Sequence, residues 1–151
     1  MRLPGRTFGR GASRFSVGLM TSAALLAGCG GPSVETFTEQ ANAVCTDHAA
    51  TIEAAASEVL AGGQLPSPEE FGRLAQETII PELTAQFEEL RDVQPPAELA
   101  AEYEAFLTTG EETLDELRAD PSILTDATNF EEANGQADAA GLSGACHIGP
   151  G

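Results

Sequence analysis

The chain has 151 residues, of which 24 are acidic and seven are arginine, so its formal net charge is −17. All the acidic residues follow position 28, where they face only three arginines, and residues 29–151 therefore carry a formal charge of about −21. This length fits one domain, and so dense a negative surface excludes nucleic acid as a partner and repels anionic lipid headgroups.

The first 28 residues have the pattern of a bacterial lipoprotein signal peptide. Four arginines precede a short apolar run over residues 15–27, and Leu26-Ala27-Gly28-Cys29 resembles the lipobox, whose cysteine is lipidated and becomes the new N-terminus. The run is shorter than the ~20 apolar residues of a membrane-spanning helix. The sequence predicts a signal peptide over 1–28 and a diacylglycerol-modified Cys29 that holds the protein on the extracytoplasmic face of the cell membrane. A plain secreted protein cleaved near Ala27 is the alternative.

Residues 29–35 are predicted to form the lipidated cysteine and a short tether, and residues 36–151 one helical domain. Thr36-Phe37-Thr38-Glu39 fits a capping box with Thr36 as the N-cap. Apolar residues then recur at helical spacing as far as Leu60, where Gly62-Gly63 ends the first helix.

Ser67-Pro68-Glu69-Glu70 is a strong start for a second helix, because it supplies an N-cap, a proline at the first position and a glutamate at the third. The apolar face of this helix continues to Leu90. Pro81 interrupts it by removing a backbone donor, so one kinked helix and two short helices both remain open.

Pro96 is well placed to begin a third helix, which ends at Asp120-Pro121. Gly110 lies inside this helix and predicts the close approach of a neighbouring helix, with a ligand groove as the alternative. No segment alternates with a period of two, and the chain is therefore predicted to be all-α, an antiparallel bundle of about four helices clasped by one disulfide.

A weaker fourth helix is expected over residues 127–140, with alanines facing inward. Gly141 has the position of a glycine just past a helix end, and Leu142 that of its hydrophobic contact. Asn134-Gly135 is a potential early break in this helix.

The disulfide is predicted from the cysteine count. With Cys29 lipidated, Cys45 and Cys146 are an even pair in an oxidising compartment. Joining them closes a loop of roughly 100 residues. In the chain-entropy model such a bridge stabilises the folded protein by about 4.7 kcal/mol. The bridge would clasp the two ends of a domain whose core is thin in aromatic residues.

Two other uses of these cysteines remain open. Cys45, His48, Cys146 and His147 match tetrahedral zinc in kind and number, although the adjacent Cys146-His147 is a poor ligand spacing. A Cys45 nucleophile activated by a histidine is the enzymatic alternative, and it needs a free thiol. We expect the disulfide, no catalytic residues, no resident metal and no cofactor.

Acidic residues often occur in pairs, such as Glu111-Glu112 and Glu131-Glu132. Neighbouring helix positions point about 100° apart, so most of these pairs indicate solvated faces. Glu112 and Glu116 do share a face, and loose binding of cations by carboxylates is an alternative use of this surface.

Three stretches together resemble a group of small actinobacterial secreted helical proteins and lipoproteins. They are Phe37-Thr38-Glu39-Gln40-Ala41-Asn42-Ala43-Val44-Cys45, Phe87-Glu88-Glu89-Leu90-Arg91-Asp92-Val93-Gln94-Pro95-Pro96-Ala97-Glu98-Leu99 and Gly141-Leu142-Ser143-Gly144-Ala145-Cys146, which follow a lipobox in this chain. The resemblance covers nearly all of the chain after the signal peptide. It implies the helical fold and the disulfide, and it transfers no functional site.

These observations predict a non-enzymatic, membrane-anchored domain that acts through contacts. Its expected partners are membrane lipid, through Cys29, and an envelope protein or the cell wall. The alternative is a small binding module for metal ions or a cationic ligand.

Overall fold

Within the described residues, the helices form four antiparallel rods, as predicted. The computed structural model describes residues 31–61, 63 and 66–150, so Cys29 and the predicted signal peptide lie outside the described residues. In chain order the elements are α1 (Val34–Leu60), α2 (Pro68–Leu74), the π-helical turn η1 (Ala75–Ile79), α3 (Ile80–Leu90), α4 (Ala100–Ala119), the 3-10 turns η2 (Pro121–Thr125) and η3 (Ala127–Phe130), α5 (Glu131–Ala139) and the 3-10 turn η4 (Gly144–Cys146).

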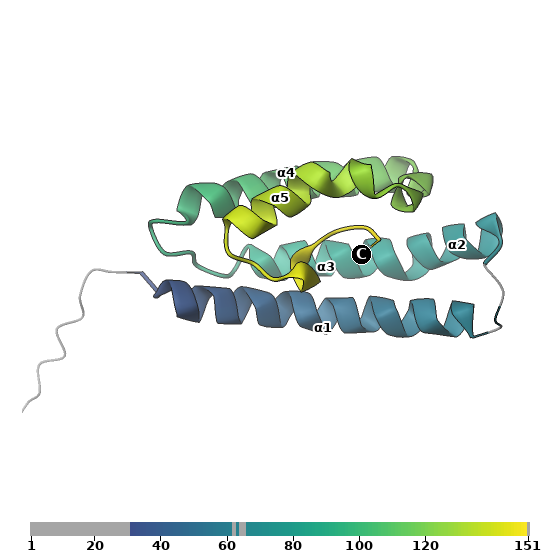
Figure 1. Cartoon of the computed structure of the whole chain (residues 1–151), viewed down its shortest axis with the longest axis horizontal. Helices are drawn as coiled ribbons and strands as arrows, with labels where there is room; N and C mark the ends of the chain where they lie inside the picture. The colour runs from purple at the N-terminus through teal and green to yellow at the C-terminus, as the bar shows by residue number, and fades with distance from the viewer. Residues whose placement is uncertain (1–30, 62, 64–65, 151) are drawn as a thin grey trace, which may run out of the picture.

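The rods lie along the long axis of the molecule, and consecutive rods run in opposite directions (Figure 1). Helix α1 packs against α3, α3 against α4, and α4 against α5. The chain after α5 returns across the bundle, and its turn η4 packs against both α1 and α5. The two ends of the domain are therefore in contact.

Helix α1 begins one turn earlier than the sequence suggested. The N-cap is Ser33, whose side chain accepts a hydrogen bond from the backbone of Thr36, so the prediction of Thr36 as N-cap was wrong. Both residues are good caps, but the backbone of Ser33 is extended and its carbonyl accepts the amide of Phe37 at 3.0 Å. The helix thus starts inside the predicted tether.

The predicted capping box at the second rod is confirmed. The Ser67 amide donates to the Glu70 carboxylate at 2.9 Å, and the Glu70 amide donates to the Ser67 hydroxyl oxygen at 3.3 Å. The hydrogen bonds from the Ser67 backbone and side chain lower the pKa of Glu70.

Pro81 neither breaks nor ends the second rod. The turn before it widens to a π-helical one, in which the amide of Ile80 donates to the carbonyl of Ala75. A proline lacks the N–H of the regular ladder and collides with the carbonyl four residues earlier. The π turn absorbs this misfit, and α2, η1 and α3 follow one another directly as one rod.

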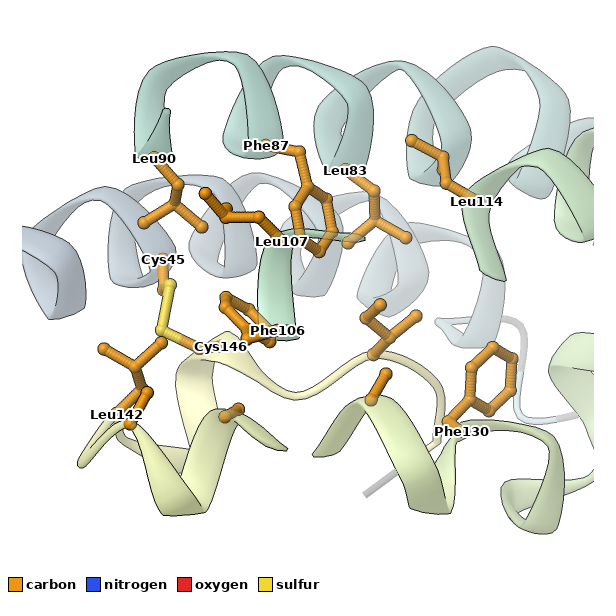
Figure 2. Close-up of a cluster of buried hydrophobic side chains, with 14 of the residues drawn as sticks. Cys45, Leu83, Phe87, Leu90, Phe106, Leu107, Leu114, Phe130, Leu142 and Cys146 are labelled. Carbon is orange, nitrogen blue, oxygen red and sulfur yellow. A yellow bond between two sulfur atoms is a disulfide. The ribbon is translucent and has the colours of Figure 1, made fainter. Parts of the chain in front are cut away.

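Aromatic side chains fill the centre of the bundle. Phe37 meets Tyr103 edge to face with ring centroids 4.8 Å apart, and Phe87 lies 5.4 Å from Phe106. The Tyr103 hydroxyl donates to the Leu90 carbonyl at 2.6 Å, and burial raises the pKa of this tyrosine. Figure 2 shows Phe87 and Leu90 pointing from α3 into this cluster.

Gly110 is the predicted point of close approach between two helices. A Cβ at this position would lie 2.2 Å from Cζ of Phe87, so the aromatic ring occupies the space that any other residue would need. The ring of Phe87 on α3 therefore packs directly against Gly110 on α4. This close contact explains why a glycine occurs in the interior of a helix.

The start of α4 lies four residues after the predicted one. Pro96 opens a turn, closed by a 3.0 Å hydrogen bond from the Leu99 amide to the Pro96 carbonyl, and the helix proper begins at Ala100.

Asp120 and Asp126 each cap a 3-10 turn, and hydrogen bonds from Ser122 and Thr128 lower the pKa values of the two carboxyls.

The end of α5 matches the prediction. Gly141 has a φ of 77°, its amide donates to the Asp138 carbonyl, and the Leu142 amide donates to the Ala137 carbonyl, both at 3.0 Å. This is a Schellman motif, with Leu142 buried as its hydrophobic contact. Asn134-Gly135 does not break the helix.

Candidate functional site

The disulfide links the first helix to the returning chain end. Cys45 of α1 and Cys146 of η4 are bonded, with Cα atoms 4.9 Å apart, across 101 positions of the sequence (Figure 2). Both residues are fully buried. The predicted bridge is confirmed, and it uses both thiols that a thiolate metal site or a Cys45 nucleophile would require.

The two histidines face carboxylates and do not join the cysteines in a cluster. His48 Nδ1 lies 2.7 Å from a Glu82 oxygen, which joins α1 to α3. His147 Nε2 lies 2.9 Å from a carboxylate oxygen of Asp138 on α5. Within the described residues, no three His, Cys, Asp or Glu side chains are grouped to hold a metal ion.

Two asparagines fix the chain after α5, and sequence reasoning missed both of these roles. Asn134 accepts from the Ile148 amide at 2.8 Å and donates to the Ile148 carbonyl at 3.0 Å. Asn42 of α1 accepts from the Ser143 amide at 2.7 Å. Together with the disulfide, these contacts hold residues 143–148 against α1 and α5.

This fixed segment forms one wall of a cavity of about 820 Å³. The opposite walls come from α1, from the rod α2–η1–α3, and from η2. Six apolar side chains provide most of the large groups around it, namely Ile52, Phe71, Ile79, Leu83, Leu124 and Ile148. A volume of this order is that of a small-molecule site, and such sites are mainly apolar with a few polar groups.

Gln86 is the most unusual residue in the lining. Its side chain is 1% exposed, and its amide nitrogen Nε2 has no hydrogen-bond partner among the described residues. It belongs to the buried face of α3, beside Leu83 and Phe87. A buried donor without a partner costs about 1–3 kcal/mol, so an apolar residue would serve the core better here.

The titratable groups that line the cavity are few. Glu53 is exposed at its edge, and His147 is held by Asp138. The lining is mainly apolar, with Glu53, Asn134 and His147 among its polar residues. It is suited to holding a molecule and contains no nucleophile paired with a base.

The outer surface is acidic and carries few large apolar groups. Two of the three arginines after residue 28 contact carboxylates, Arg91 that of Glu111 and Arg118 that of Asp115. In the described ranges, the large hydrophobic side chains that are exposed are Val34 and Leu60. None of the described helices combines the length and the hydropathy needed to cross a bilayer.

Comparisons of the chain with family models, with curated proteins and with solved structures found no match.

Proposed function

We propose that this protein is a lipoprotein, anchored through a diacylglycerol on Cys29 to the outer face of the cytoplasmic membrane, whose helical domain acts by non-enzymatic contacts. The disulfide between Cys45 and Cys146 is the observation that carries the proposal. Disulfides form and persist outside the reducing cytosol, which is where the lipobox pattern would deliver the chain.

The early start of α1 supports a position close to the membrane. Ser33 caps the helix only four residues after Cys29, and so few residues span at most ~14 Å when fully extended. The domain would therefore sit beside the headgroups, while its formal charge of about −21 keeps its surface from adhering to them.

The same charge indicates the chemistry of the partner. A surface with few exposed apolar side chains offers little for hydrophobic docking, and its carboxylates attract cationic groups. The proposed partner is an envelope protein or a cell-wall component that presents positive charge near the membrane.

The test compares wild type, Cys29→Ser and, as a matched control beside the lipobox, Gly31→Ser in intact cells. We expect wild type and Gly31→Ser in the membrane fraction and Cys29→Ser outside it, because only the cysteine can carry the thioether lipid. Cross-linking in the same cells should capture a reproducible partner with wild type and much less with Cys29→Ser.

Membrane retention of Cys29→Ser would contradict the anchor. Repeated cross-linking of wild type without any partner would contradict the contact function.

A further inference from the structure

We propose that Asn134 is a site of spontaneous deamidation, which the folded chain end protects and which, once modified, no longer holds that chain end. The pair Asn134-Gly135 lies inside α5, and both polar groups of the Asn134 side chain bind the backbone of Ile148. The site is independent of the anchored contact function proposed above, because the reaction needs neither a partner nor an anchor.

The reaction uses the backbone of the following residue. The nitrogen of Gly135 attacks Cγ of Asn134, the bond between Cγ and Nδ2 breaks, and the proton from the Gly135 nitrogen leaves with Nδ2 as ammonia. Water then opens the cyclic imide, which gives aspartate when the new bond breaks and isoaspartate when the bond to the former backbone carbonyl breaks. One water is consumed and one ammonia is released, and nothing is oxidised or reduced.

Asn134 is the asparagine best suited to this reaction. Of the three asparagines in the chain, it alone is followed by a glycine. A residue without a Cβ leaves the approach of its own nitrogen to the preceding side chain unobstructed, and its backbone turns freely. Asn42 and Asn129 are followed by residues with side chains, so we expect them to react more slowly and to serve as internal references.

The folded protein keeps the two reacting groups apart. Gly135 lies in the interior of α5, where its amide belongs to the helical ladder and does not turn toward the preceding side chain. The Asn134 nitrogen donates to the Ile148 carbonyl at 3.0 Å, and its oxygen accepts from the Ile148 amide at 2.8 Å. Reaction therefore requires α5 and the chain end to open together, and its rate follows the population of that open state.

The chain end that protects Asn134 is itself packed. The disulfide holds Cys146 two residues before Ile148, whose side chain is buried. On the other side, Gly149 has a φ of 91° and passes so close to Phe130 that a Cβ would lie 2.3 Å from its ring. The contacts of Asn134 thus belong to an ordered segment and not to a free tail.

Deamidation would remove part of this attachment permanently. A carboxylate at position 134 still accepts from the Ile148 amide, but it has no hydrogen to donate to the Ile148 carbonyl, and the two oxygens repel each other. The new charge also lies one helical turn before Asp138, where like charges are unfavourable. Isoaspartate adds an atom to the main chain and disturbs the helix itself. Refolding reverses neither product, so the change runs in one direction.

The test follows each asparagine of the purified protein over time by peptide mapping, which separates asparagine, aspartate and isoaspartate. Wild type unfolded in guanidinium chloride with reductant is compared with folded wild type in sodium chloride at the same concentration, pH and temperature. We expect Asn134 to convert before Asn42 and Asn129 in the unfolded chain. In the folded protein its conversion should be at least about 10-fold slower.

Ile148→Pro isolates the contribution of the chain end. Proline has no amide hydrogen for Asn134, and His147 before it already has the extended backbone that a proline requires, with a φ of −70° and a ψ of 143°. The matched control, Ile148→Val, keeps the amide. We expect folded Ile148→Pro to deamidate roughly 2- to 10-fold faster than Ile148→Val.

Two more variants test the mechanism and its consequence. Gly135→Ala should slow the reaction in the unfolded chain to about the rate of the reference asparagines, because its Cβ obstructs the attack. Asn134→Asp reproduces one product. Hydrogen exchange of residues 147–149 should be roughly 2- to 10-fold faster in this variant than in wild type, while the amides of α1 keep their rates.

The proposal is overturned if Asn134 converts equally fast in folded and unfolded wild type, or if another asparagine converts first in the unfolded chain. The same holds if Gly135→Ala converts as fast as wild type, if folded Ile148→Pro converts as slowly as Ile148→Val, or if Asn134→Asp leaves the exchange of residues 147–149 unchanged. The comparison of folded with unfolded wild type decides the protection even when Ile148→Pro does not fold.

Discussion

Replacing Cys45 and Cys146 together by alanine is expected to lower the free energy of unfolding by about 2–5 kcal/mol, the largest single effect in this molecule. The bridge closes a loop across 101 sequence positions and holds the chain end that forms one wall of the cavity. Without it, η4 depends on the hydrogen bonds of Asn42 and Asn134. Urea unfolding followed by circular dichroism measures the change.

Wild type treated with a reductant is the matched control for this variant. It loses the same covalent link but keeps both sulfur-bearing side chains in the core, so it separates the bridge from the two small cavities that alanine creates. We expect its unfolding midpoint to lie close to that of the double variant. If the double variant and the reduced wild type both unfold at the same urea concentration as the oxidised protein, the bridge does not stabilise the bundle.

Gly110→Ala should destabilise the protein by about 1–3 kcal/mol, although alanine is the better helix former. The new Cβ would lie 2.2 Å from Cζ of Phe87. That ring is 2% exposed and packs against Phe106, so it has no free space into which to move. Either the ring leaves its position or α3 and α4 separate, and both cost packing.

Gly135→Ala is the control for this prediction. Gly135 is exposed inside α5 and a Cβ there would meet nothing within 4 Å, so alanine should stabilise by up to about 1 kcal/mol. Phe87→Leu combined with Gly110→Ala should recover part of the loss, since the shorter side chain leaves room. A Gly110→Ala protein as stable as wild type would contradict the ring-against-glycine contact.

The fold was predictable because its determinants are local. Ser67 and Glu70 signal a helix start within four residues, and Gly141 with Leu142 signals a helix end within two. The disulfide followed from the cysteine count and the exported context. Helix boundaries were harder to predict where two residues could each act as the N-cap, as Ser33 and Thr36 could at the start of α1.

The site was not predictable, because its parts meet only in three dimensions. Asn134 had the signature of a helix break, and its actual role depends on Ile148 lying beside α5. The sequence carried no signal for Gln86, because its burial depends on how the helices pack. The cavity itself is a space between rods, and no residue pattern records its volume.

The most direct test of the account is the intact mass of the protein extracted from its own membrane, measured after alkylation without reductant. We predict a chain that begins at a diacylglycerol-modified Cys29, lacks the two thiol hydrogens and takes up no alkylating group. This result would establish the anchor and the Cys45–Cys146 bridge together. An unmodified Cys29, or alkylation of Cys45 and Cys146, would contradict the anchored, disulfide-clasped bundle.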